Sequence, residues 1–233
     1  MKIEDREIGH SVPPYVIAEI GVNHDGDPAR AVALTRAAAE AGASAVKLQL
    51  FRADLLMSRA SALAAYQAAA GEQDPWAMLR RLELSAAAME PVVREAHARG
   101  IHAIVTVFST ELVAEAETLA WDSYKSASPD LINKPLLAAM AGTGRPLIVS
   151  TGAGTIEEVA RAAGWLRGQA DRVAFLQCVS SYPTPEESAE LDGIEAIADV
   201  FAGPVGYSDH TPGLTAGASA VRRGAVILVL DDL

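Results

Sequence analysis

The chain has 233 residues, with 19 basic against 30 acidic side chains and a formal net charge of −11. This charge argues against a nucleic-acid-binding or basic membrane-surface protein, and no apolar run reaches the about 18 residues of a membrane span. Half of the residues are hydrophobic and Cys178 is the single cysteine, so we expect a globular cytoplasmic protein without intrachain disulfides.

Short β-rich runs alternate with alanine-rich helical runs along the whole chain. The expected strands cover residues 15–20, 45–51, 102–107, 122–127, 146–150, 173–179, 204–208 and 225–230, and the expected helices lie near 28–42, 86–99, 110–120, 134–142, 155–168, 190–201 and 213–223. Asp27 before Pro28 is typical of a helix start, and Thr155 with Glu158 fits a capping box. Alternating βα units of this kind predict a parallel sheet covered by helices.

Eight strands predict a (β/α)8 TIM-type barrel, with a doubly wound open sheet as the alternative. Neither a G-x-G-x-x-G motif nor a P-loop follows the first strand, and this favours the barrel. We expect one domain over residues 1–233, with a long insertion at about 52–84 that is either a functional lid or a surface excursion. No eighth helix follows the last strand, so we expect an uncovered, self-associating flank unless a partner chain or the N-terminal segment covers it.

Polar residues at the carboxyl ends of barrel strands predict the position of the site. Lys47 and Gln49 share the inward face of one strand because strand side chains alternate, and Lys125 lies in a second strand. A lysine inside a barrel is costly unless it meets an anion, so the two lysines indicate a small anionic ligand, or else ion pairs with nearby carboxylates. Four hydroxyl groups at strand ends are available to complete a phosphate and carboxylate cradle: Thr106, Ser128, Ser150 and Ser208.

Three further residues have more than one interpretation. Glu19, in an apolar strand, is either paired with a lysine or a positioned acid or base. His210 follows the seventh strand and, taken alone, is more typical of a surface or hydrogen-bonding residue than of a ligand. Cys178 has no evident base beside it and is more typical of a small core residue than of a nucleophile.

Seven segments resemble the N-acetylneuraminate (sialic acid) synthase family, which includes synthases of related nonulosonic acids. They are I-A-E-I-G-V-N-H-D-G (17–26), A-G-A-S-A-V-K-L-Q (41–49), R-L-E-L-S (81–85), Y-K-S-A-S (124–128), S-T-G-A-G-T-I-E-E (150–158), Q-C-V-S-S-Y-P-T-P (177–185) and G-Y-S-D-H-T-P-G (206–213). The resemblance implies a barrel that condenses phosphoenolpyruvate with the aldehyde of an N-acyl hexosamine and releases phosphate. It also implies a divalent metal, Mn²⁺ or Mg²⁺, and a homodimer in which a C-terminal antifreeze-like domain reaches the partner's site.

The resemblance also implies roles for individual residues. Lys47 and Lys125 match phosphoenolpyruvate-binding positions, together with the four hydroxyl residues named above. Glu19 matches a carboxylate near the reacting carbons. The resemblance also matches Gln49, Tyr182 and Asn23 to family residues that line the substrate site. It matches His210 to one of the family's two metal-binding histidines.

The chain departs from the family pattern at several places. Asp231 stands where the second metal-binding histidine is expected, and a carboxylate can also bind Mn²⁺ or Mg²⁺. V-F-S at 107–109 lacks an expected aspartate, and the antifreeze-like domain with its sugar-contacting arginine does not follow. We therefore expect an acceptor that is either an N-acyl hexosamine or another aldehyde. Two alternatives stay open: a truncated or degenerate member that acts as a non-catalytic binding protein, and a Schiff-base aldolase with Lys125 as the reactive lysine.

Overall fold

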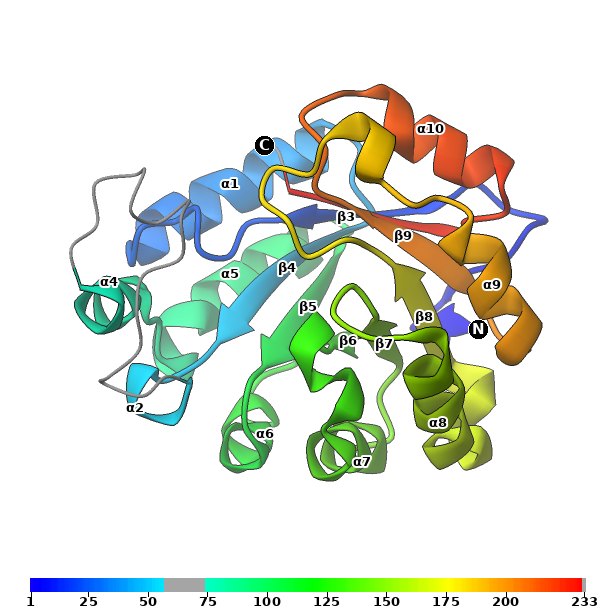
Figure 1. Cartoon of the computed structure of the whole chain (residues 1–233). Helices are drawn as coiled ribbons and strands as arrows, with labels where there is room; N and C mark the ends of the chain where they lie inside the picture. Colours follow the sequence, from blue (N-terminus) through cyan, green and yellow to red (C-terminus); the bar gives the residue numbers. More distant parts are fainter. Residues whose placement is uncertain (57–73, 232–233) are drawn as a thin grey trace.

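The structure, a computed structural model, describes residues 1–56 and 74–231. Eight parallel strands close into a barrel in the order β10-β3-β4-β5-β6-β7-β8-β9, with helices outside it (Figure 1). The strands are β3 (Tyr15–Glu19), β4 (Ala45–Leu50), β5 (His102–Val107), β6 (Ser123–Lys125), β7 (Leu147–Ser150), β8 (Val173–Gln177), β9 (Val205–Asp209) and β10 (Ile227–Leu230). The predicted (β/α)8 TIM-type barrel is confirmed.

The helices follow the strands in the expected alternation. They are α1 (Pro28–Glu40), α2 (Ala53–Leu56), α4 (Pro75–Leu82), α5 (Ala86–Ala98), α6 (Thr110–Ala116), α7 (Lys134–Gly142), α8 (Ile156–Trp165), α9 (Gly193–Val200) and α10 (Thr215–Arg222), with short 3-10 turns at Ser128–Ile132, Arg167–Arg172 and Glu186–Ser188. The Asp27 carboxylate accepts a hydrogen bond from the Ala29 amide at 2.8 Å, and Thr155 with Glu158 forms the predicted capping box. Local capping chemistry therefore sets these two helix starts.

Two apolar layers lie on the two sides of the barrel wall. Leu48 and Leu50 of β4 belong to the outer layer between the strands and the helices. Inside the barrel, the amino-terminal half is filled by apolar side chains such as Ile17, Ile104 and Ile148. Since side chains alternate along a strand, the inward positions nearer the carboxyl ends are left for polar residues.

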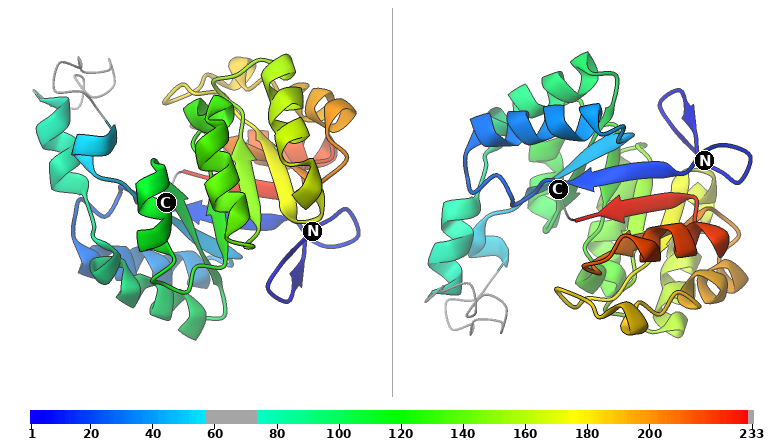
Figure 2. Two further views of the ribbon diagram at one scale, coloured as in Figure 1. Left: turned by 90° about the horizontal axis from the view of Figure 1, so that it is seen from below. Right: turned by 90° about the horizontal axis from the view of Figure 1, so that it is seen from above.

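An N-terminal hairpin closes the amino end of the barrel. β1 (Lys2–Ile3) and β2 (Arg6–Glu7) pair antiparallel, and Ile3 and Ile8 are buried against the inner apolar layer. Figure 2 shows the hairpin at one end of the molecule and α2 and α4 at the other. This hairpin was not predicted, because strands of two residues carry no periodic signal.

The flank beside β10 is the one expected to be uncovered. The N-terminal segment covers the end of the barrel and not this flank, where Leu230 of the outer face is only partly buried. A cavity of about 470 Å³ lies there, lined by α10, β10 and the loop before α10. Self-association through this flank stays a prediction.

The expected insertion at 52–84 is described in part. Its two ends form α2 and α4, which contact each other, and residues 57–73 lie outside the described residues.

No helix within 1–56 and 74–231 is long and apolar enough to cross a membrane. The single domain and the cytoplasmic location remain predictions.

Candidate functional site

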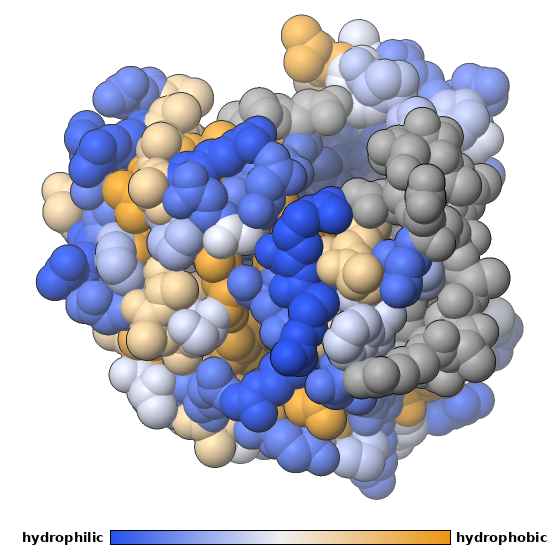
Figure 3. All heavy atoms as spheres, turned by 90° about the vertical axis from the view of Figure 1, so that its left-hand side faces the viewer, coloured by the Kyte–Doolittle hydropathy of each residue, from blue (hydrophilic) through white to orange (hydrophobic). Residues whose placement is uncertain are grey.

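A cavity of about 620 Å³ opens at the carboxyl ends of the strands. Each of the eight strands, or the residue or two after it, contributes a lining side chain: Glu19, Lys47, Thr106, Lys125, Ser150, Cys178, Ser208 and Asp231. Figure 3 looks onto this end of the molecule, where hydrophilic and hydrophobic residues lie side by side. Barrel closure therefore brings residues far apart in the sequence into one site.

All twelve site residues named from the sequence line this cavity. They are Glu19, Asn23, Lys47, Gln49, Thr106, Lys125, Ser128, Ser150, Tyr182, Ser208, His210 and Asp231. They differ in exposure: Tyr182 is 49% exposed, whereas Lys47 and Ser208 are buried. Their convergence supports the choice of residues, while the role of each stays a prediction.

Glu19 and Lys47 form a buried ion pair across β3 and β4. The amide of Gly21 also donates to the Glu19 carboxylate at 3.0 Å. Burial raises the pKa of Glu19, and the neighbouring Lys47 ammonium opposes that rise. Lys47 is thus paired with a carboxylate, and both members of the pair line the cavity, where a ligand can also reach them.

Lys125 has a different environment. Its Nζ donates to Ser150 Oγ at 2.8 Å, and no carboxylate of the described residues lies within ion-pairing distance. Burial, and then the positive charge of Lys47, lower the pKa of Lys125 to about 8. The cavity therefore contains one charge-paired lysine and one lysine held only by a neutral hydroxyl.

The hydroxyl groups of the predicted cradle are in different states. Thr106 Oγ1 is buried and makes no hydrogen bond within the described part of the chain. Ser128 Oγ accepts from the Gly152 amide at 3.2 Å and lies 3.2 Å from the Cys178 thiol. Cys178 is buried, as a core residue would be, yet it also lines the cavity. A buried hydroxyl without a partner is costly, so a ligand that hydrogen-bonds to Thr106 Oγ1 would remove this cost.

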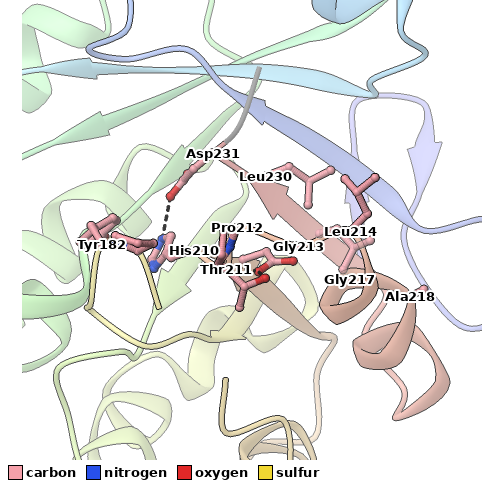
Figure 4. A pocket seen from close by; sticks show the side chains of 13 residues that line it. Tyr182, His210, Thr211, Pro212, Gly213, Leu214, Gly217, Ala218, Leu230 and Asp231 are labelled. Atoms are coloured by element: carbon pink, nitrogen blue, oxygen red, sulfur yellow. Dashed lines mark hydrogen bonds and ion pairs between the residues drawn. The ribbon is translucent and has the colours of Figure 1, made fainter. Parts of the chain in front are cut away.

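His210 is held at the cavity edge by contacts with several residues. Its Nδ1 lies 2.7 Å from the Val179 carbonyl oxygen, and the Tyr182 ring packs on it at 4.3 Å between centroids. Figure 4 shows Asp231 reaching toward His210, with Oδ2 at 3.0 Å from Nε2. A carbonyl can only accept, so Nδ1 carries the proton, and Nε2 presents a lone pair to Asp231 unless the ring is charged.

This donor arrangement fits a divalent cation. A neutral imidazole nitrogen and a carboxylate oxygen that face each other need either a proton or a metal ion between them. Both groups are common ligands of Mn²⁺, and Nδ1 is already oriented by a backbone carbonyl. The described residues contain no group of three or more His, Cys, Asp and Glu side chains that could hold a metal by themselves. The remaining ligands would come from substrate or water.

Sequence reasoning missed the residues that hold His210 in place. The Val179 carbonyl orients the ring, and the Thr184 amide donates to the His210 carbonyl at 2.8 Å. Thr184 Oγ1 also donates to the Ser181 carbonyl at 2.8 Å, which folds the 179–184 loop against the histidine. The sequence carries no signal for this contact, because it joins two loops that only the fold brings together.

Part of the cavity lining is an apolar cluster, called the apolar wall below. It is formed by Phe51 and Phe108 at strand ends and by Met78 and Leu82 of α4. The two phenyl rings meet edge to face with centroids 6.1 Å apart. Phe51 ends one predicted strand and Phe108 directly follows another, so the strand-end rule that selected the polar residues would also have selected them.

The loop after β3 is fitted closely to α4. Gly26 has φ +75°, and a Cβ at this position would overlap the Arg81 carbonyl oxygen. Glycine is therefore required both by the backbone conformation and by the close approach. This contact places Asn23 and Val22 at the cavity next to the apolar wall.

The fold and this site define a TIM-type barrel with a polar site at the carboxyl ends of its strands. A family model described as "NeuB family" matches residues 34–229, and the chain belongs to that family. The N,N'-diacetyllegionaminic acid synthase of Legionella pneumophila is 35% identical over 94% of this chain. The spore coat polysaccharide biosynthesis protein SpsE of Bacillus subtilis is 33% identical over 97%.

Solved structures agree with these matches. The N-acetylneuraminic acid (sialic acid) synthetase of Leptospira borgpetersenii, in complex with citrate, superposes with a TM-score of 0.88 at 27% identity, covering 98% of this chain and 76% of that one. A truncated 3-deoxy-D-arabino-heptulosonate 7-phosphate synthase of Thermotoga maritima shares the fold alone, with a TM-score of 0.72 at 11% identity. The chain spans 64% of the Legionella relative and 61% of the Bacillus relative.

Proposed function

We propose that this protein condenses phosphoenolpyruvate with an aldehyde sugar to form a nonulosonic acid of the sialic acid type. The observation that carries the proposal is the pair of buried lysines that line one cavity together with the buried Thr106 hydroxyl, which has no partner among the described residues. Two ammonium groups and a free hydroxyl suit a small, multiply charged anion. Relatives named as synthases of such acids support the same reaction class.

The reaction forms one carbon–carbon bond and releases one phosphate. The terminal enol carbon of phosphoenolpyruvate attacks the aldehyde carbon, and the aldehyde oxygen takes up a proton as the hydroxyl. Water adds to C2, loses a proton, and phosphate leaves as the 2-oxo group forms. Lys47 and Lys125 bind the anionic donor and stabilise the charge that shifts toward phosphate.

Glu19 is the acid–base group in this scheme. It lies beside Lys47 on the neighbouring strand and accepts the Gly21 amide, so its carboxylate is held in one orientation. Because burial raises its pKa, the carboxylate is basic enough to take a proton from the attacking water. Gln49 donates to the Gly21 carbonyl at 3.0 Å and so stabilises the same turn.

His210 and Asp231 would hold the divalent metal, Mn²⁺ or Mg²⁺. When bound, such an ion polarises the aldehyde oxygen of the acceptor. Tyr182 packs on His210 and, being half-exposed, is placed to contact the acceptor as well. Asp231 takes the position where the family pattern has a histidine, which gives this site one harder oxygen ligand.

The apolar wall suits an acceptor with an acyl or deoxy group. Met78, Phe51 and Phe108 line the same cavity as the polar cradle, so an acceptor that reaches the donor can contact them. Burying a methyl group there contributes about 0.8 kcal/mol for each carbon removed from water. The acyl methyl group of an N-acyl hexosamine would make this contact.

We also propose that the protein forms a homodimer.

The test is phosphate release from phosphoenolpyruvate by the 233-residue chain, with Mn²⁺ and N-acetylmannosamine, against mixtures that lack each component. Release that requires both supports the synthase. Binding of phosphoenolpyruvate by calorimetry without release with any N-acyl hexosamine would favour the non-catalytic binding protein instead. Lack of both binding and release would overturn the proposal.

A further inference from the structure

Lys125 is buried without a counter-ion, which is a costly state for an ammonium group. Of the lysines in the described residues, only Lys47 and Lys125 are buried, and Lys47 is neutralised by Glu19. The one hydrogen-bond partner of Lys125 Nζ is the neutral Ser150 hydroxyl at 2.8 Å. A buried amine with a second cation nearby and no carboxylate partner is stabilised in its neutral, nucleophilic form.

We propose that Lys125 is a nucleophile that forms an imine with the C2 carbonyl of a small 2-oxo acid such as pyruvate. This activity needs neither phosphoenolpyruvate nor an aldehyde acceptor, so it goes beyond the proposed function. Among the described residues, the amine faces a cavity of about 620 Å³ that is open to solvent and admits a three-carbon acid.

The groups around Lys125 match the other parts of a 2-oxo acid. Thr106 pairs with Lys125 in the strand register, and its buried hydroxyl has no partner within the described residues. It can therefore donate to the carboxylate of the ligand or to the hydroxyl of the first adduct. The Lys47 ammonium lines the same cavity and attracts the carboxylate.

The chemistry balances without an oxidant or reductant. The nitrogen lone pair adds to C2, and the carbonyl oxygen takes up a proton to give a carbinolamine. Loss of the hydroxyl with a second proton leaves a carbon–nitrogen double bond and one water molecule. Transfer of a C3 proton to the Glu19 carboxylate would then convert the protonated imine to an enamine, which is a carbon nucleophile like the enol of phosphoenolpyruvate.

The two kinds of ligand use the two protonation states of the same lysine. An anionic phosphate favours the ammonium form, and a carbonyl compound reacts with the neutral amine. With its pKa near 8, Lys125 has about two-hundredfold more neutral amine at neutral pH than an exposed lysine with a pKa of about 10.4. Exposed Lys2 and Lys134 therefore serve as internal controls in the same chain.

The test is reductive trapping. The full chain is incubated with pyruvate and sodium borohydride, and the adduct is located by peptide mass spectrometry. Among the lysines, we expect one reduced adduct, at Lys125, in about two-hundredfold excess over Lys2 and Lys134. The α-amino group of Met1 also reacts with carbonyl compounds, and peptide mapping distinguishes its adduct from that of Lys125. Lactate has no carbonyl group and should give none, and excess phosphoenolpyruvate should protect the lysine.

Two variants complete the design. Lys125→Arg should remove the adduct, while Lys134→Arg should leave it unchanged. If Lys125→Arg does not fold, the position of the adduct in the unaltered chain still decides the test. Failure to trap pyruvate, or an adduct spread evenly over all lysines, would overturn the proposal. Neither result bears on phosphate release from phosphoenolpyruvate, so the proposed function is tested separately.

Discussion

Lys47 and Lys125 lie in one cavity, on β4 and β6, with different partners. Glu19 neutralises Lys47, whereas Lys125 has only the Ser150 hydroxyl. A mutation of Lys47 leaves a buried carboxylate uncompensated, but a mutation of Lys125 does not. The two residues should therefore respond differently to substitution and to pH.

Replacing Lys47 with methionine should reduce both stability and donor binding. Loss of one member of a buried ion pair costs about 3–5 kcal/mol of unfolding free energy. Loss of a charged hydrogen bond to phosphoenolpyruvate costs about 1.5–3 kcal/mol, or about a 10- to 150-fold rise in Kd. Urea denaturation and calorimetry measure the two effects. Lys134→Met, outside the cavity, should change neither, and unchanged donor affinity in Lys47→Met would contradict the cradle.

The affinity for phosphoenolpyruvate should fall as pH rises through about 8. Lys125 is an ammonium below its lowered pKa of about 8 and a neutral amine above it. An anionic donor binds the ammonium form, so binding is fully supported below this pH and weakened above it. Calorimetric titration from about pH 7 to about pH 9 measures the change. In Lys125→Arg the affinity should be independent of pH over this range, because guanidinium stays charged.

At the scale of elements, helix starts differ in how well they are capped. Thr155 forms a complete capping box with Glu158 at α8, whereas Ser109 at α6 makes no side-chain capping bond. A capped start satisfies amides that otherwise lack partners. The two helices therefore provide a matched comparison within one fold.

Thr155→Ala should lower the free energy of unfolding by about 0.5–2 kcal/mol. Ser109→Ala should lower it by less, because no capping hydrogen bond is removed. Thermal and urea unfolding of both variants measure the difference. Equal losses would mean that the capping box contributes nothing beyond intrinsic preference.

At the scale of the whole molecule, the barrel is filled from one end and open at the other. Ile3 and Ile8 of the N-terminal hairpin complete the apolar filling at the amino end, and the cavity occupies the carboxyl end. The hairpin is remote from the site, so changes in it test stability without altering the site residues.

Ile3→Ala should destabilise the barrel by about 2–5 kcal/mol, because it leaves a cavity in a fully buried cluster. Lys2→Ala, at the exposed neighbouring position, should change stability by less than about 0.5 kcal/mol. Urea denaturation of both variants is the measurement. A neutral Ile3→Ala would show that the hairpin does not close the barrel.

Much of the site could be predicted because one geometric rule selects it. In a barrel the polar residues at strand ends converge, and alternation puts Lys47 and Gln49 on the same face. The apolar wall was overlooked because the rule was applied to polar side chains alone. Thr184 and the Val179 carbonyl were overlooked because a backbone contact between two loops leaves no pattern in the sequence.

The sequence by itself determined the order of strands and helices, the starts of α1 and α8, and the inward set of side chains. These follow from contacts between residues a few positions apart, which periodicity and capping motifs record directly. The tertiary structure alone decided which lysine pairs with Glu19, that Thr106 has no partner, and that His210 faces Asp231. Each depends on distances between residues from different strands, and barrel closure sets those distances.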